Sequence, residues 1–160
     1  MSTKSNYLQQ YDLASQSRWT AYRIFGKRLF DLTVILPIFL AISPVLLLAA
    51  VLIKLDSRGP VFFYQERLGR YGKTFITYKF RTMIHRKREA THEILPGHSE
   101  VTRVGHWLRR FKIDEMPQLL NIVTGDMSLV GPRPALPEHI NEYNKDGLRR
   151  LLERPGLTGL

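Results

Sequence analysis

The feature that most constrains this chain is an apolar run without a single charge, from Leu32 to Ile53. At about 1.5 Å per residue, a straight helix of this length is just long enough to cross the hydrocarbon core of a bilayer. Pro37 and Pro44 lie inside the run, and each removes a backbone donor and crowds the preceding helical turn. Because Ser43-Pro44 stands near the midpoint, the pattern predicts a kink between two half-helices, each reaching about halfway through the hydrocarbon.

Basic residues flank the apolar run on both sides. Those that precede it, with no acid among them, are Arg18, Arg23, Lys27 and Arg28. Basic residues also outnumber acidic ones between positions 54 and 73. Because basic flanks tend to stay cytoplasmic, both ends are predicted to lie on that side, as in a re-entrant hairpin. The polar groups freed at Pro44 would be met by the Ser43 hydroxyl or by packed protein. A kinked spanning helix and a soluble core helix remain as alternatives.

Composition narrows the classes of partner. The 160 residues hold 24 Lys and Arg against 14 Asp and Glu, a net charge of +10, which favours an anionic partner. Beside an apolar run, an anionic lipid leaflet or a phosphorylated substrate is favoured over nucleic acid, for which no reading motif is evident. The chain has no cysteine, so disulfides, thiol catalysis and cysteine-ligated metal sites are excluded.

The chain divides into three parts. Residues 1–17 are polar and rich in Ser and Gln, a composition typical of a mobile tail. Residues 18–30 interleave aromatic and aliphatic side chains with basic ones, as a helix lying in the membrane interface does. We therefore predict an interfacial helix and a re-entrant membrane helix over residues 18–55, and a cytosolic domain over residues 56–160. The predicted fold class is α+β and mostly helical.

Two aromatic and β-branched runs, 61–66 and 74–82, flank a glycine-containing turn and predict a small β-hairpin. The period of two places Lys79 and Arg81 on one face of the second strand. This face is either an ordinary solvated surface or part of a site. Residues 101–111 show helical spacing, with apolar side chains on one side and basic ones on the other. This second amphipathic segment either packs on the core or contacts the membrane.

Asp114 and Glu115 are the first candidate functional residues. They precede Pro117, which belongs in the first turn of a helix, and Gly125 is a natural stop for that helix. Backbone N–H groups and the helix dipole favour acidic residues at this position, so an ordinary capping role explains them as well as a function does. Basic residues at positions 109, 110 and 112 predict that both carboxylates stay ionised. An ionised carboxylate among cations is what a phosphoryl acceptor or a magnesium ligand needs.

A short rigid loop supplies the next candidate. Pro132 and Pro134 bracket Arg133, which fixes the backbone on both sides of the guanidinium. A fork-shaped guanidinium on a rigid loop suits a diphosphate. A merely stiff connection between two elements would also explain the pattern. The helical segment that follows, residues 138–153, ends at Arg154-Pro155-Gly156.

Taken together, these residues resemble a known family. The order is the proline-broken apolar run, then KFRTM at 79–83, DEMPQLLNIVTGDMSLVGPRP at 114–134 and RPGLTG at 154–159. This order resembles the bacterial sugar transferases, the monotopic polyprenol-phosphate phosphoglycosyl transferases, in their minimal form. The likeness extends from about residue 27 to residue 160, and the block 114–134 is its most specific part.

The resemblance implies a chemistry for this chain. It implies a membrane helix that turns back at Ser43-Pro44, and a catalytic domain over residues 56–160 with an Asp114-Glu115 dyad. A phosphosugar would pass from a UDP-sugar to polyprenol (undecaprenyl) phosphate, with release of UMP. Asp114 would form a covalent phosphosugar intermediate, and Glu115 would help to hold Mg²⁺. The implied phosphate- or nucleotide-binding residues are Lys79, Arg81, Pro132, Arg133, Pro134 and Arg154.

The resemblance also implies a setting. The enzyme would lie at the cytoplasmic face of a bacterial inner membrane and start a glycan such as an exopolysaccharide, with the sugar and the oligomeric state left open. Family members normally continue past RPGLTG with a further helical segment, so the chain is expected to be truncated at its C-terminus. A non-catalytic basic membrane scaffold, or a family member inactivated by that truncation, is the alternative.

Overall fold

The computed structural model describes residues 25–84, 100–142 and 145–159. The predicted mobile tail (1–17) and residues 18–24 of the predicted interfacial helix lie outside these residues. The described end of that helix, residues 27–30, forms the first turn of the long helix α2. The prediction that the interfacial segment leads directly into the membrane helix can therefore be followed only from residue 25 onward.

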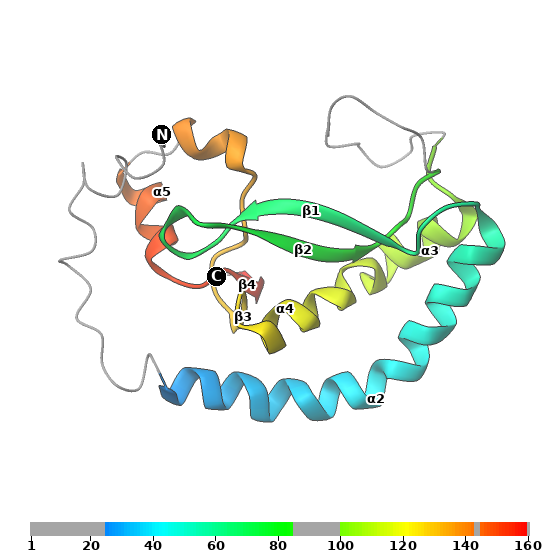
Figure 1. The fold of residues 1–160 in the computed structure, drawn as a ribbon, viewed down its shortest axis with the longest axis horizontal. Helices are drawn as coiled ribbons and strands as arrows, with labels where there is room; N and C mark the ends of the chain where they lie inside the picture. Colours follow the sequence, from blue (N-terminus) through cyan, green and yellow to red (C-terminus); the bar gives the residue numbers. More distant parts are fainter. Residues whose placement is uncertain (1–24, 85–99, 143–144, 160) are drawn as a thin grey trace.

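The described residues form three layers, seen in Figure 1. The curved helix α2 lies on one side, the antiparallel β1–β2 hairpin on the other, and the short helices η3 and α4 lie between them. The α+β, mostly helical fold predicted from sequence is confirmed. The elements are α2 (Lys27–Asp56), β1 (Phe62–Leu68), η2 (Arg70–Gly72), β2 (Thr74–Phe80), α3 (Arg103–Arg110), η3 (Ile113–Gln118), α4 (Leu119–Thr124), β3 (Ser128–Val130), η4 (Pro137–Glu142), α5 (Lys145–Arg149), η5 (Arg150–Leu152) and β4 (Gly156–Thr158).

Helix α2 is continuous through both of its prolines. The Ser43 hydroxyl donates a 2.8 Å hydrogen bond to the carbonyl of Leu40, which is the acceptor that Pro44 cannot serve because it has no N–H. The predicted role of this hydroxyl is thus confirmed. The predicted division into two half-helices is wrong, because α2 is one continuous, curved helix (Figure 1); the re-entrant path stays a prediction.

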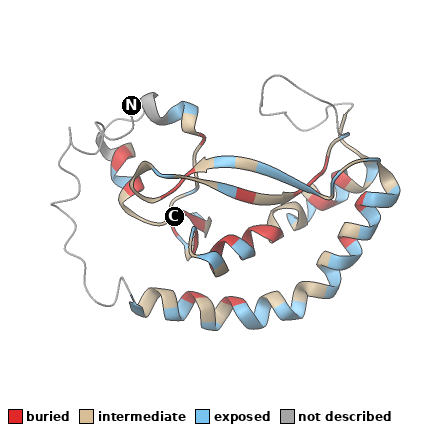
Figure 2. Ribbon diagram, in the orientation of Figure 1, coloured by how far each residue is buried: buried red, intermediate tan, exposed pale blue. Residues whose placement is uncertain are grey.

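Most of the apolar surface of α2 is exposed. The helix is long and apolar enough to cross a membrane, and only 11% of its most apolar window is buried. Figure 2 shows this exposed outer side. A core helix of a soluble protein is mostly buried, so the exposure counts against that alternative. The large exposed side chains are Leu29, Phe30, Leu36, Ile38, Leu40, Val45, Leu47, Leu48, Val51, Leu52 and Leu55.

Helix α2 packs on the rest of the molecule near both of its ends. Toward its N-terminal end, buried Ile35 packs with Leu119, Ile122 and Met127. Toward its C-terminal end, Ala49 and Ile53 pack with Phe80 and Leu108. The helix therefore lies along the rest of the molecule rather than pointing away from it.

A polar contact fixes the register of α2 against the middle layer. Asp31 is buried, and its two carboxylate oxygens accept from the Ser128 hydroxyl at 2.8 Å and the Leu129 N–H at 3.2 Å. Arg28, one turn earlier, donates to the carbonyls of Ile122 and Val123 at the end of α4. A buried carboxylate is tolerated only when such partners are present, so α2 can dock in few other positions.

The amide of Asn121 joins the hairpin to α4. Asn121 is fully buried; its Oδ1 accepts from the Tyr78 N–H at 3.2 Å, and its Nδ2 donates to the Ile76 carbonyl at 2.7 Å. The side-chain amide thus pairs with a backbone N–H and a backbone carbonyl at the edge of β2, as a neighbouring strand would. The predicted hairpin is confirmed with slightly shifted bounds, and its inner face, which carries Thr77 and Lys79, lies against η3.

Two short strands that the sequence did not predict bring distant loops together. Strand β3 pairs in parallel with β4, Ser128 opposite Gly156 and Val130 opposite Thr158. The backbones cross so closely that a Cβ at Gly131 would lie 2.3 Å from the Arg154 carbonyl oxygen, and one at Gly156 would lie 2.1 Å from the Gly131 nitrogen. Both positions therefore require glycine.

We expect Asn121→Ala to lower the free energy of unfolding by about 2–4 kcal/mol, because it leaves a buried N–H and a buried carbonyl of β2 without partners. Urea unfolding of the protein in detergent, followed by circular dichroism, measures this change. The matched control is Leu120→Ala, a larger truncation at a partly exposed position of the same helix, expected to cost about 1 kcal/mol or less. Equal losses for the two variants would contradict the bridging role of Asn121.

Candidate functional site

The acidic pair lies where the sequence predicts it, at the start of a helix. Lys112 adopts a left-handed conformation (φ 58°), and η3 begins at the next residue. Asp114 and Glu115 occupy the first turn of η3. Pro117 has no N–H to donate to the carbonyl four residues earlier, and the segment is a 3₁₀ helix that becomes α-helical only at α4.

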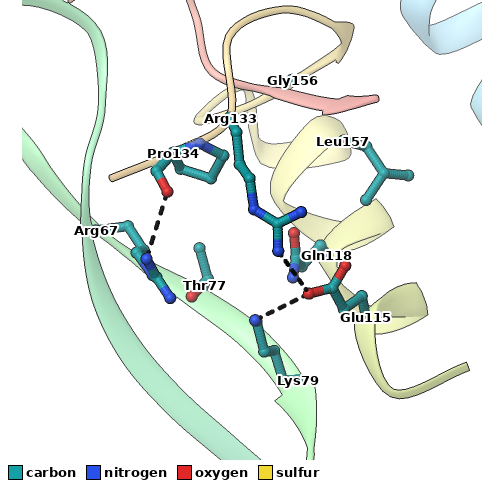
Figure 3. A pocket seen from close by; sticks show the side chains of 9 residues that line it. All are labelled: Arg67, Thr77, Lys79, Glu115, Gln118, Arg133, Pro134, Gly156 and Leu157. Atoms are coloured by element: carbon teal, nitrogen blue, oxygen red, sulfur yellow. Dashed lines mark hydrogen bonds and ion pairs between the residues drawn. The ribbon is translucent and has the colours of Figure 1, made fainter. Parts of the chain in front are cut away.

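Glu115 gathers two basic side chains from distant parts of the chain. Its Oε1 lies 3.1 Å from Lys79 Nζ on β2 and 3.5 Å from Arg133 Nη2 on the loop after β3. Figure 3 shows the three side chains converging. The Glu115 side chain is 25% exposed, whereas that of Arg133 is 77% exposed. The arginine thus remains accessible to a ligand while it contacts the carboxylate.

These residues line a shallow, open hollow, which we call the Glu115 hollow. Three of the predicted phosphate-binding residues line it: Lys79, Arg133 and Pro134. Sequence reasoning missed Arg67 and Gln118, which also line it (Figure 3). Arg67 shares the alternating face of β1 that points inward, but nothing in the local pattern sets it apart from other strand cations. The lining residues are Arg67, Thr77, Lys79, Glu115, Gln118, Arg133, Pro134, Gly156 and Leu157.

The structure places the remaining candidates elsewhere. Arg81 is 5% exposed, and its guanidinium donates to the Ser57 carbonyl and hydroxyl and to the Arg58 carbonyl at 2.7–3.0 Å. It ties the end of β2 to the end of α2, and burial lowers its pKa despite the opposing charge of Asp56. Pro132 lines a neighbouring hollow. Arg154 is not among the residues that line the Glu115 hollow, although its carbonyl lies against Gly131.

The two adjacent carboxylates experience opposite environments. Burial raises the pKa of Asp114, the charge of Glu115 raises it further, and Lys79 and Arg109 oppose these effects without cancelling them. Burial alone would also raise the pKa of Glu115, but Lys79, then Arg133 and Lys112, hold it below its usual value. Basic residues thus favour the ionised form of both carboxylates, as expected, but at Asp114 burial and the charge of Glu115 outweigh them.

The Asp114 carboxylate is not fully hydrogen-bonded among the described residues. Its Oδ1 is buried and has no hydrogen-bond partner among the described residues. An unsatisfied buried acceptor costs free energy, and such costs are typical of functional sites. Sequence reasoning named Arg109 only as a neighbouring charge. Its Nε donates to the Thr82 hydroxyl at 2.9 Å, and its charge acts to lower the pKa of Asp114.

The family model described as "Bacterial sugar transferase" matches residues 22–160 of the chain. The chain belongs to the bacterial sugar transferase family. The match covers every element described above, including the acidic pair and the Glu115 hollow. The family resemblance seen in the sequence is thereby confirmed.

Individual relatives support the same family. The chain is 43% identical over 133 residues to the uncharacterized sugar transferase EpsL of Bacillus subtilis, a match that covers 83% of this chain and 65% of that protein. It is 43% identical over 141 residues to the undecaprenyl-phosphate glucose phosphotransferase of Komagataeibacter xylinus, a match that covers 83% of this chain and 26% of that protein. It is 45% identical over 139 residues to the UDP-glucose:undecaprenyl-phosphate glucose-1-phosphate transferase of Caulobacter vibrioides, a match that covers 84% of this chain and 52% of that protein. The chain thus spans between about a quarter and two thirds of the length of these family members.

The acidic pair also suits the magnesium ion implied by the family. Among the described residues there is no cluster of three or more Asp, Glu, His or Cys that would form an all-protein metal site. Mg²⁺ is commonly bound by one or two carboxylates together with substrate phosphates. Glu115, ionised and beside a cationic hollow, provides such a carboxylate, so the donor set fits an ion that binds together with a diphosphate.

Two substitutions test the opposite environments of the acidic pair. Because the pKa of Glu115 is lowered, its ionised form stabilises the fold above pH 4.5, and this stability is lost as the pH falls through the lowered pKa. We expect Glu115→Gln to be less stable than the parent at pH 7 by about 1 kcal/mol. We expect the difference to shrink below pH 4.5. Because the pKa of Asp114 is raised, ionisation costs stability at neutral pH, so Asp114→Asn should be more stable at pH 7, with a gain that vanishes below pH 3.8.

Melting temperatures between pH 3 and pH 8 in detergent measure both differences. Asp126→Asn, at an exposed position of the loop after α4, is the matched control and should change little at any pH. A loss of stability at pH 7 for Asp114→Asn would contradict the dominance of burial at that residue.

Proposed function

We propose that the protein transfers a sugar 1-phosphate from a UDP-sugar to polyprenol phosphate, releases UMP and so initiates a glycan. The observation that carries this proposal is the convergence of Lys79 and Arg133 on Glu115, beside the buried carboxylate of Asp114. A carboxylate nucleophile next to phosphate-binding cations is the arrangement that this reaction needs. Relatives named as undecaprenyl-phosphate sugar phosphotransferases support the same reaction.

In the first step, an Asp114 carboxylate oxygen attacks the β-phosphorus of the donor. A bond forms between this oxygen and phosphorus, and the bond from phosphorus to the bridging oxygen breaks, so UMP leaves with the bridging oxygen. The candidate nucleophile is the Asp114 carboxylate, whose buried and unpartnered Oδ1 must become accessible to the donor before it can react. Burial and the charge of Glu115 raise its pKa, and a carboxylate destabilised in this way is a better nucleophile than a fully solvated one.

In the second step, a phosphate oxygen of the polyprenol phosphate attacks the same phosphorus. The bond between Asp114 and phosphorus breaks, the carboxylate is restored, and a polyprenol diphosphosugar is released. Two displacements at the same phosphorus thus replace one direct reaction between two anions. Lys79 and Arg133 hold the phosphate oxygens throughout, and a magnesium ion bound by Glu115 would offset their negative charge.

The packing of α2 supports a re-entrant position in the membrane. If a helix spans the bilayer, a domain that lies on one side of the membrane can contact only one end of it. The folded domain instead contacts α2 at Ile35, near one end, and again at Ile53, near the other. Both of its ends then lie on the side where a soluble nucleotide sugar and a lipid phosphate can meet. The basic flanks favour the cytoplasmic side.

Helix α3 supplies a second membrane contact in this proposal. Trp107 and Phe111 stack at 5.9 Å and are 56% and 59% exposed. The Arg110 guanidinium lies 5.5 Å from the Trp107 ring. Exposed aromatic rings beside basic side chains are typical of the membrane interface.

The first experiment measures UMP release. We expect the purified protein in detergent, with Mg²⁺, polyprenol phosphate and a panel of UDP-sugars, to release UMP with at least one donor. Asp114→Asn removes the nucleophile and should lower turnover by about 10³-fold or more. Asp126→Asn should retain activity.

The outcomes separate the enzyme from a scaffold. Lipid-dependent UMP release that disappears in Asp114→Asn supports the transferase and identifies the donor sugar. Full activity in Asp114→Asn contradicts the covalent mechanism. An inactive parent protein that still binds membranes, also when extended at its C-terminus, would favour a non-catalytic scaffold.

The second experiment tests the membrane contact of α3. The chain has two tryptophans, so Trp19→Phe leaves Trp107 as the only one. In vesicles we expect its emission to shift to the blue and to be quenched by lipids brominated on their acyl chains. The control is Tyr64→Trp on the hairpin, at a 57% exposed site, in a chain that lacks both native tryptophans. Absence of quenching at Trp107, or equal quenching at both sites, would contradict the proposed orientation.

A further inference from the structure

Gln118 is a buried polar side chain at the Glu115 hollow. It is the last residue of η3 and is only 5% exposed, yet it lines the hollow beside Glu115 (Figure 3). Side chains three positions apart eclipse one another on a 3₁₀ helix. Glu115 and Gln118 have this spacing, so both side chains reach the hollow from the same side of η3.

The side-chain amide of Gln118 has no hydrogen-bond partner among the described residues. Its neighbour Glu115 is already paired with Lys79 and Arg133. Burying an amide without a partner costs free energy, and native proteins keep few such groups unless they have a function. A ligand that enters the hollow would supply the missing partner.

The chemistry of the amide indicates which part of a ligand it meets. A glutamine amide donates through Nε2 and accepts through Oε1. The oxygens of an ionised diphosphate only accept, so a diphosphate would leave Oε1 of Gln118 unpaired. A hydroxyl group both donates and accepts. The amide therefore suits a hydroxyl of a sugar better than it suits the phosphates.

The position of Gln118 relative to Asp114 favours the donor sugar over the ribose of the nucleotide. A 3₁₀ helix rises about 2 Å per residue, so Gln118 lies only about 8 Å along η3 from Asp114. In the proposed first step, the donor sugar is bonded through one oxygen to the phosphorus that Asp114 attacks. The ribose is separated from this phosphorus by the α-phosphate. The donor sugar thus stays nearer to η3 than the ribose does.

We propose that Gln118 hydrogen-bonds a hydroxyl of the donor sugar and so selects among UDP-sugars. The inference rests on the proposed function, and it assigns the choice of sugar to a residue that sequence reasoning did not name. A site that pairs a buried amide with a substrate hydroxyl discriminates against an analogue without that hydroxyl, because the amide is then left without a partner.

The test compares donors in the UMP-release assay, with the full chain in detergent and saturating polyprenol phosphate. Gln118→Met keeps the length of the side chain and removes both hydrogen-bonding groups. We expect kcat/KM for the active UDP-sugar to fall about tenfold. One single-deoxy analogue of that sugar should already be a poor donor for the parent protein, and Gln118→Met should cause no further loss with it.

Two controls separate sugar recognition from other roles of Gln118. The affinity for UDP, measured by calorimetry, should not change in Gln118→Met. Leu120→Met introduces the same side chain two residues later, outside the lining of the hollow, and should behave as the parent does. Because the amide has no partner among the described residues, Gln118→Met should also keep the melting temperature of the parent. If it unfolds, Gln118→Asn, which draws the amide back by one methylene, replaces it with the same expectations.

The remaining outcomes contradict the inference in different ways. Weaker binding of UDP would place the amide on the nucleotide instead of the sugar. Equal losses with the donor and with every deoxy analogue would indicate a general effect on the site, and unchanged kinetics would show that the amide meets no substrate. Each of these results overturns the inference. A parent protein that releases no UMP with any donor would instead overturn the proposed function.

Discussion

The arrangement of this protein depends on where the apolar surface of α2 is covered. One side of the helix packs on the rest of the molecule at Ile35 and Ile53, while the other side exposes many aliphatic side chains. Burial of apolar surface is the dominant favourable term in folding, so this second side suits the lipid contact that we propose. The buried Asp31 then fixes the helix against β3. Through this contact, the proposed membrane helix and the loop that carries Arg133 are positioned by the same few residues.

The acidic pair illustrates how two neighbouring carboxylates acquire different chemistry. Glu115 faces Lys79 and Arg133 and is held in its charged form. Asp114, one residue earlier, faces the protein interior, and burial outweighs its basic neighbours. The separation arises because successive residues of a tight helix point in different directions. In the proposed function, one carboxylate balances the cations while the other forms the covalent bond, a division of roles that a pair of equivalent carboxylates would not provide.

Local patterns predicted the local features of the fold. The strands of the hairpin, the glycine stop after α4 and the acidic start of η3 follow from residues within a few positions of one another. The Ser43 hydroxyl bond followed from the chemistry of a single proline. The contacts that build the site join residues far apart in sequence, and local pattern carries little information about them. Arg81 lies on the same face of the strand pattern as Lys79 and has the same charge. It is nevertheless buried against Ser57, because the end of β2 lies beside the end of α2. Arg67 and the crossing of Gly131 with Gly156 depend on packing alone.

The parallel pairing of β3 with β4 has a consequence for how the protein matures. The backbone around Gly131 and Pro132 is completed by hydrogen bonds with residues 156–158, which come later in the chain than every other described element. During synthesis the N-terminal parts emerge first, so α2 is available to enter the bilayer well before the loop of Arg133 can take its shape. If α2 inserts as proposed, the nascent chain reaches the membrane before the proposed phosphate site can form. The proposed activity would then arise only in molecules whose helix has already had time to insert.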